Sequence, residues 1–142
     1  MPEHIFDNLG EDAAAGNIWP VIKGNRYILL TGELGSGKTA LVRNIARLLG
    51  VSGIVSSPTF SIHNSYSADN IKIVHSDLYR LTSAIELEQT GFFELLEEGG
   101  ADYMFIEWAD LFNIKDMLER YAEIDIIKTG ETVRRYRINV RL

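Results

Sequence analysis

The chain contains no cysteine, which excludes disulfide bonds, zinc sites built from thiolates and a cysteine nucleophile. It also has no apolar run approaching the length of a membrane span, about 20 residues. The first 16 residues lack the basic segment followed by an apolar segment that marks a secretory signal. These absences predict a cytoplasmic protein that does not contact a membrane.

Positive charge is scarce, with 14 Lys and Arg against 20 Asp and Glu. We therefore expect no strong direct binding to nucleic acid, which depends on basic side chains that neutralise phosphates. The charges are unevenly distributed, because residues 86–125 are mainly acidic and residues 128–142 mainly basic. Solvated helix faces followed by a basic strand are the simplest interpretation. A basic tail that contacts nucleotide phosphates or an acidic partner is the alternative.

Glycine, in contrast, is concentrated in one informative segment. Residues 32–39 read GELGSGKT, which is the G-x-x-x-x-G-K-[ST] pattern of a phosphate-binding P-loop. Its glycines let backbone N–H groups surround phosphate oxygens, Lys38 would reach the β- and γ-phosphates, and the Thr39 hydroxyl would ligate Mg²⁺. The predicted nucleotide-binding residues here are Gly32, Glu33, Leu34, Gly35, Ser36, Gly37, Lys38, Thr39 and Ala40.

The pattern around the loop predicts an α/β fold in a single P-loop domain spanning residues 1–142. Residues 26–30 predict a buried strand before the loop, and residues 38–49 show helical spacing that ends at Gly50. Hairpins are predicted around residues 60–76 and 123–140, helical segments from Ser83 to Glu98 with a break near Gly91, and a buried strand at 103–106. We therefore expect a P-loop NTPase-like three-layer sandwich whose mixed sheet includes antiparallel hairpins.

Two acidic residues are candidates for holding Mg²⁺ beside Thr39. Glu107 directly follows the apolar run 103–106, and ligands of open α/β sheets bind at the carboxyl ends of such strands. Asp77 follows the strand predicted at 71–76. The structural alternatives are a solvent-facing strand end for Glu107 and a turn cap for Asp77. Trp108 could pack in the core or lie at the mouth of the site.

A third segment, Ser57-Pro58-Thr59, could sense the nucleotide, because its Thr59 hydroxyl could approach Mg²⁺ or the γ-phosphate. A plain entry into a strand explains the segment equally well. The three histidines, His4, His63 and His75, show no metal-ligand spacing, so we expect each to be structural or exposed.

Some nucleotide-dependent functions are disfavoured by missing segments. The chain has no N-K-x-D sequence for guanine recognition, which argues against a GTPase. A small-molecule kinase usually has Arg-rich helical lid segments, whereas a hairpin is predicted here after the first helix. The residues alone leave open an ATPase, a small-molecule kinase and a nucleotide-gated binding module that does not hydrolyse.

Four segments occur together in a characteristic order: the P-loop at 32–39, SPTF at 57–60, DLYRL at 77–81 and IEW at 106–108. This set resembles the TsaE family of bacterial P-loop ATPases that act in tRNA threonylcarbamoyladenosine biosynthesis. The resemblance implies a protein that binds ATP with Mg²⁺, hydrolyses it slowly and acts with TsaB and TsaD, which perform the threonylcarbamoyl transfer.

The resemblance also implies roles for individual residues. Lys38 would hold phosphates, Thr39 and Glu107 would hold Mg²⁺, and Asp77 would help at the metal or position water. Thr59 would belong to a switch-like segment, and Arg134 would lie near the nucleotide. The catalytic set is therefore Lys38, Glu107 and Asp77, and the metal set is Thr39, Glu107 and Asp77.

The segment before the first strand departs from the family pattern. The family usually has a clear helix there, whereas Pro20 in this chain is expected to break it. Contacts from this segment to the adenine are therefore not assigned. Whether a natural chain extends beyond Leu142 is also left open.

Overall fold

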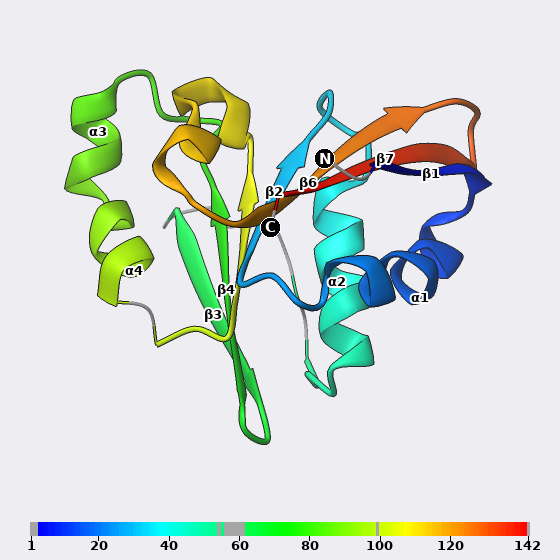
Figure 1. Cartoon of the computed structure of the whole chain (residues 1–142), viewed down its shortest axis with the longest axis horizontal. Helices are drawn as coiled ribbons and strands as arrows, with labels where there is room; N and C mark the ends of the chain where they lie inside the picture. Colours follow the sequence, from blue (N-terminus) through cyan, green and yellow to red (C-terminus); the bar gives the residue numbers. More distant parts are fainter. Residues whose placement is uncertain (1–2, 54, 56–61, 99, 142) are drawn as a thin grey trace.

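The computed structural model of the chain describes residues 3–53, 55, 62–98 and 100–141. Within these residues, seven strands form one mixed sheet in the order β1-β7-β6-β2-β5-β4-β3 (Figure 1). Their bounds are β1 Glu3–Leu9, β2 Tyr27–Thr31, β3 His63–Ala68, β4 Ile71–Asp77, β5 Tyr103–Glu107, β6 Tyr121–Lys128 and β7 Arg134–Arg141. The four central strands β4, β5, β2 and β6 run parallel, and the outer strands pair antiparallel with them or with each other.

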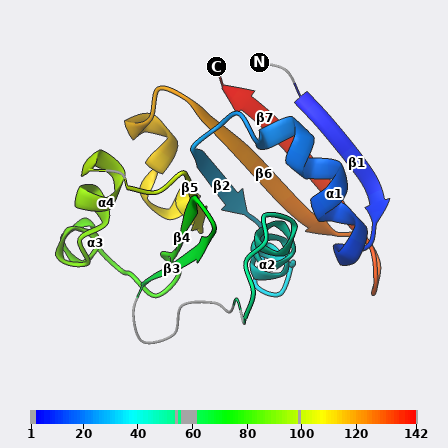
Figure 2. The same ribbon diagram turned by 90° about the horizontal axis from the view of Figure 1, so that it is seen from below.

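Helices cover both faces of this sheet. They are α1 Glu11–Ile22, α2 Lys38–Leu48, α3 Ala84–Gln89 and α4 Phe92–Glu98, with two 3₁₀ turns, η1 Ala109–Phe112 and η2 Ile114–Met117. Figure 2 shows α1 and α2 together beside the half of the sheet that holds β6, β7 and β1, while α3 and α4 lie beyond β3 and β4. The predicted α/β class with layered helices is confirmed.

Strand β2 separates two hydrophobic cores. Ile28 and Leu30 pack with buried residues of α1 and α2, whereas Leu29 packs with a second core that includes Leu87 of α3 and Phe92 of α4. Successive side chains of a strand point to opposite faces, so a strand buried on both faces must be apolar at every position. The P-loop therefore begins directly after a strand that is buried on both faces.

Both predicted hairpins are present. Strands β3 and β4 pair antiparallel around Asp69 and Asn70, and β6 pairs antiparallel with β7. The predicted break between α3 and α4 falls at Gly91, whose φ of 82° lies in the left-handed region that favours glycine. Ser83 is the N-cap of α3 and its hydroxyl accepts from the Glu86 N–H, while the Glu86 carboxylate accepts from the Thr82 N–H.

The prediction that Pro20 breaks the first helix is wrong. Helix α1 runs from Glu11 to Ile22 through Pro20, and the Lys23 N–H still donates to the Trp19 carbonyl at 2.9 Å. Four residues of this helix are buried, and their packing outweighs the local cost of a proline in the last turns. The four are Ala14, Ala15, Ile18 and Ile22.

Strand β1 was not predicted from the sequence. It is an edge strand that pairs antiparallel with β7, and most of its side chains are exposed. An exposed edge strand needs no alternation of apolar residues, so its sequence carries little signal. Among the described residues, no helix has the length and apolar character needed to cross a membrane.

Candidate functional site

The P-loop connects β2 to α2 and depends on glycine geometry. Gly32, Gly35 and Gly37 have φ values of 146°, 79° and 109°, which side-chain-bearing residues rarely adopt. A Cβ on Gly32 would lie 2.6 Å from the Ile126 carbonyl oxygen, so this position also has no space for a side chain. Gly37 is the N-cap of α2, and the helix N-terminus therefore lies at the loop.

Lys38 is the first residue of α2 and is only 4% exposed. Its ammonium donates to the carbonyls of Gly32 at 2.6 Å and Glu33 at 2.9 Å, and lies 4.3 Å from the centre of the Trp108 ring. Burial lowers the pKa of Lys38, and the carboxylates of Glu107, Asp77 and Asp110 act in the opposite direction. The three acids thus support the charge of a largely buried lysine.

Glu107 and Thr39 meet beside this lysine. The Thr39 hydroxyl donates to Oε2 of Glu107 at 2.8 Å, and Glu107 is 3% exposed at the carboxyl end of β5. Asp77 ends β4 and lies level with Glu107, since β4 and β5 pair in parallel register. An oxygen of Asp77 also accepts the Tyr79 N–H at 3.0 Å. The alternative of Glu107 as a solvent-facing strand end does not fit this burial.

These residues surround one cleft of 310 Å³ beside the P-loop. The sequence-predicted residues that line it are Leu34, Gly35, Gly37, Lys38, Thr39, Ala40, Asp77 and Glu107. Gly32, Glu33 and Ser36 instead line a neighbouring cavity of 470 Å³, which lies between the loop and the segment Asp125–Lys128. The P-loop is thus the wall between two cavities. Thr59 lies outside the described residues.

Trp108 lies at the cleft, which answers the question that the sequence left open. Its ring is 4.8 Å from the ring of Tyr79, and both residues line the cleft beside Lys38. Trp108 has a φ of 61°, an unusual backbone conformation for a bulky residue, and its N–H donates to the Leu30 carbonyl at 3.0 Å. The strand-to-turn geometry after Glu107 directs this ring toward the cleft.

Arg134 contacts the loop from the start of β7, on the face of the sheet that α1 and α2 cover. Its Nε donates to the Ser36 carbonyl at 2.8 Å, and its Nη2 pairs with the Glu11 carboxylate at 3.1 Å. The arginine is 6% exposed. The family resemblance implies that Arg134 lies near the nucleotide, and the structure shows it hydrogen-bonded to the loop backbone. Glu11 was missed, because 123 positions separate it from Arg134 and no local pattern marks the pair.

His75 was also missed as a neighbour of the site. It is fully buried in β4, and its Nε2 lies 2.5 Å from Oε2 of Glu107. A signal for this contact was available in the sequence, since His75 precedes Asp77 by two positions and therefore shares its face of the strand. The contact also requires β4 to lie beside β5 in the sheet, and no local sequence pattern predicts that strand order.

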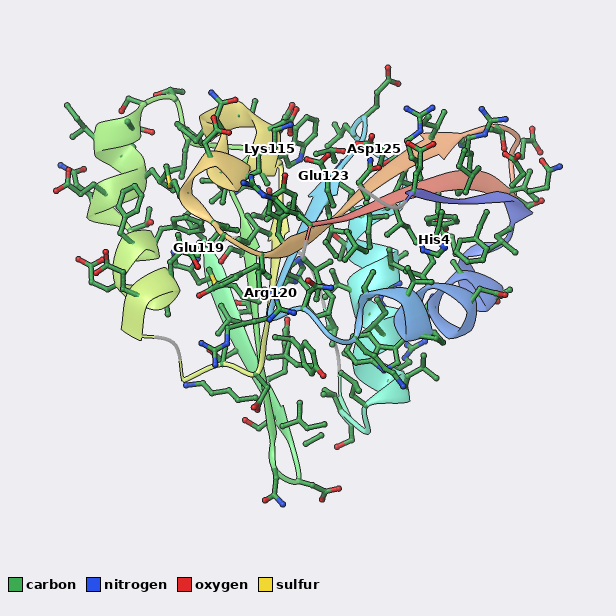
Figure 3. The ribbon with its side chains drawn as sticks, in the orientation of Figure 1. His4, Lys115, Glu119, Arg120, Glu123 and Asp125 are labelled. Atoms are coloured by element: carbon green, nitrogen blue, oxygen red, sulfur yellow. The ribbon has the colours of Figure 1, made fainter. Side chains whose placement is uncertain are left out.

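A second acidic group lies on β6, near the neighbouring cavity. Burial raises the pKa of both Glu123 and Asp125, and the charges of Lys115 and Arg137 partly oppose the shifts. Asp125 also accepts a hydrogen bond from the Thr31 hydroxyl. Figure 3 shows Lys115, Glu123 and Asp125 with their side chains near one another along the upper part of the molecule.

The donor set beside the loop suits Mg²⁺. Thr39, Glu107 and Asp77 offer hydroxyl and carboxylate oxygens, which are the ligands that this hard cation prefers. Within the described ranges, no group of three or more His, Cys, Asp or Glu residues could hold a metal by itself. Mg²⁺ is typically bound by one or two carboxylates together with phosphate oxygens and water, so these residues fit a cation that arrives with a nucleotide.

Comparison with known proteins identifies the family. Residues 6–136 match the family described as "Threonylcarbamoyl adenosine biosynthesis protein TsaE". The chain belongs to the TsaE family. A TsaE protein of Aquifex aeolicus is 34% identical over 126 residues, which cover 87% of this chain and 84% of the relative. The earlier resemblance to TsaE is thereby confirmed.

Other relatives match a shorter part. The TsaE protein of Rickettsia conorii is 40% identical over 98 residues, which cover 68% of this chain and about half, 53%, of that protein. The crystal structure of Bacillus subtilis YdiB superposes with a TM-score of 0.71 at 22% identity, covering 98% of this chain and 86% of that one. At this identity the YdiB structure shows the shared fold alone.

Proposed function

We propose that this TsaE chain is a single-domain, Mg²⁺-dependent ATPase that is weak alone and acts in tRNA N6-threonylcarbamoyladenosine modification with the TsaB–TsaD complex. The observation that carries the proposal is the meeting of Lys38, Thr39 and Glu107 at one cleft beside the P-loop. Membership of a family named for this pathway supports the biological role. A role in tRNA modification is also consistent with a cytoplasmic location.

Each residue at the cleft has a role that its contacts support. The backbone N–H groups of the loop and the N-terminus of α2 would bind phosphate oxygens. Lys38 would exchange its carbonyl partners for the β- and γ-phosphates and stabilise charge on the transferring phosphoryl group. Thr39 and Glu107 would ligate Mg²⁺, which neutralises phosphate charge when bound. Asp77 would contact the cation through water or orient the attacking water.

We expect slow turnover by the protein alone. An arginine that stabilises the transferring phosphoryl group is worth several orders of magnitude in rate. Arg134 contacts the P-loop, but its donors are directed at the Ser36 and Val133 carbonyls and at Glu11. A partner that completes the site would raise the rate, which is why we include TsaB–TsaD in the proposal.

The test is ATP hydrolysis with Mg²⁺, measured for the protein alone and with a TsaB–TsaD pair. We expect low turnover that rises with the pair and is lost in Lys38→Ala. Lys23→Ala is the matched control, because Lys23 is an exposed residue at the end of α1. Normal hydrolysis by Lys38→Ala would contradict the P-loop assignment.

Two other results would favour different functions. ATP consumption that depends on an added small-molecule acceptor would indicate a kinase. Tight ATP binding without turnover, alone or with the pair, would indicate a nucleotide-gated binding module. Turnover that ignores the pair would leave an ATPase and remove the partner from the proposal.

A further inference from the structure

Glu107 is held by two donors on one of its oxygens. Oε2 lies 2.5 Å from Nε2 of His75 and accepts the Thr39 hydroxyl at 2.8 Å. The other oxygen, Oε1, receives no hydrogen bond from the described residues, and Glu107 lines the 310 Å³ cleft. Because both contacts use Oε2, Oε1 is left available to accept a further ligand.

The sheet places His75 where it can reach Glu107. In the parallel register of β4 and β5, His75 lies beside Phe105 and Asp77 lies beside Glu107. His75 and Glu107 are therefore diagonal neighbours on one face of the sheet, which is the face that α2 covers. Thr39, at the start of α2, approaches the same carboxylate from above this face.

The other ring nitrogen of His75 indicates where the proton lies. Nδ1 is buried and has no hydrogen-bond partner among the residues that the structure describes. If the proton were on Nδ1, that buried N–H would have no acceptor. Nε2 would then face the Glu107 carboxylate with no hydrogen between them. This tautomer is therefore costlier than the one with the proton on Nε2. The tautomer that carries hydrogen on Nε2 satisfies the Glu107 carboxylate and leaves only a bare lone pair unpaired.

We propose that His75 is a positioning residue that donates from Nε2 to Oε2 of Glu107 and thereby presents Oε1 to the cation that accompanies the nucleotide. The inference rests on the proposed function, because it gives Glu107 a ligand role. Outer-shell donors of this kind orient the ligating carboxylate, and their loss typically weakens metal binding about 10–100-fold.

The first test is the protonation pattern of the His75 ring in the unchanged protein, measured by NMR on ¹⁵N-labelled histidine without nucleotide. His4→Gln and His63→Gln assign the signals, since these are the other two histidines of the chain. We expect a proton on Nε2 of His75. A bare Nε2 would overturn the proposal, and this result does not depend on a His75 variant that folds.

The second test compares His75→Gln with His75→Asn. The Gln amide nitrogen can occupy the place of Nε2, whereas the Asn amide nitrogen reaches only the place of Nδ1. We expect His75→Asn to weaken Mn²⁺ affinity about 10–100-fold in the presence of ADP, measured by electron paramagnetic resonance, and His75→Gln to keep it within about threefold. His4→Gln, on the edge strand β1 (Figure 3), is the control and should change nothing.

The affinity for ADP in EDTA separates positioning from general damage to the site. A positioning role leaves this metal-free affinity unchanged in His75→Asn, whereas a merely structural role would lower it together with the Mn²⁺ affinity. Equal Mn²⁺ affinities in the Asn and Gln variants would overturn the proposal. Failure of the proposed function looks different, because the unchanged protein would then show no gain in Mn²⁺ affinity when ADP is added.

Discussion

Glu107 and Asp77 lie level with each other on neighbouring strands, but their surroundings differ. Glu107 is buried and bonded to Thr39 and His75, whereas Asp77 is half-buried and also accepts a backbone N–H in the turn that follows β4. A carboxylate fixed beside the P-loop hydroxyl is better placed as a direct ligand. We therefore propose that Glu107 binds the cation directly and that Asp77 contacts it through water.

Glu107→Gln removes the negative charge of this side chain while keeping its size and an oxygen that can accept hydrogen bonds. The amide oxygen of Gln can still accept from Thr39 and His75, so the free energy of unfolding should change by less than about 1 kcal/mol. The lost negative charge should raise the Mg²⁺ concentration needed for ATP hydrolysis at least about tenfold. Thermal unfolding and a Mg²⁺ titration of hydrolysis measure the two effects.

Asp77→Asn is the comparison for this experiment. Its Mg²⁺ requirement should change less than that of Glu107→Gln, because a water lies between the carboxylate and the cation in our assignment. An unaltered Mg²⁺ requirement in Glu107→Gln, with a large change in Asp77→Asn, would move the direct ligand role to Asp77.

Strand β7 and helix α1 together hold the P-loop in shape. Arg134 at the start of β7 donates to the Ser36 carbonyl, and Glu11 at the start of α1 pairs with Arg134. A Cβ on Gly37 would lie 3.1 Å from a Glu11 oxygen, so this carboxylate also packs against the loop. Two elements far apart in the sequence therefore support the loop before any phosphate binds, which lowers the cost of ordering it.

Arg134→Met removes these contacts and keeps a side chain of similar length. The Ser36 carbonyl and the Glu11 carboxylate then lose a donor, so we expect a loss of about 1–3 kcal/mol in the free energy of unfolding and weaker nucleotide binding. Arg135→Met is the matched control on the same strand. In the described part of the chain, the Arg135 side chain forms an exposed ion pair with Asp7, which should contribute little. Equal effects of the two variants, by denaturant unfolding and nucleotide titration, would refute the supporting role of Arg134.

The features predicted from the sequence are those whose signals are local. The P-loop spacing, the apolar run before Glu107 and the break at Gly91 each lie within a few residues, and the structure contains all three elements. The contact between Glu11 and Arg134 depends on the packing of distant elements, and the contact between His75 and Glu107 depends on the strand order. The prediction at Pro20 was wrong because burial of the α1 side chains outweighed the tendency of proline to break a helix.

The cleft joins parts of the molecule that otherwise belong to separate cores. Lys38 and Thr39 come from α2, which packs in the core with α1, whereas Trp108 packs against the other core, which includes α3 and α4. Glu107 and Asp77 lie at the carboxyl ends of the strands between the two cores. A nucleotide that contacts these residues would link both halves of the sheet, so its binding should stabilise the whole domain.

We expect ADP with Mg²⁺ to raise the free energy of unfolding by about 2.7 kcal/mol when the ligand is present at 100 times its dissociation constant. For a chain of this size, that corresponds to a rise of roughly 10 °C in Tm. Lys38→Ala should show little of this rise at the same ligand concentration, because in our proposal the Lys38 ammonium binds the phosphates. Lys23→Ala should show all of it. The measurement is thermal unfolding with and without ligand, with EDTA to separate the part that depends on the cation. An equal rise in Lys38→Ala and the unchanged protein would mean that the nucleotide stabilises the fold from a site other than this cleft.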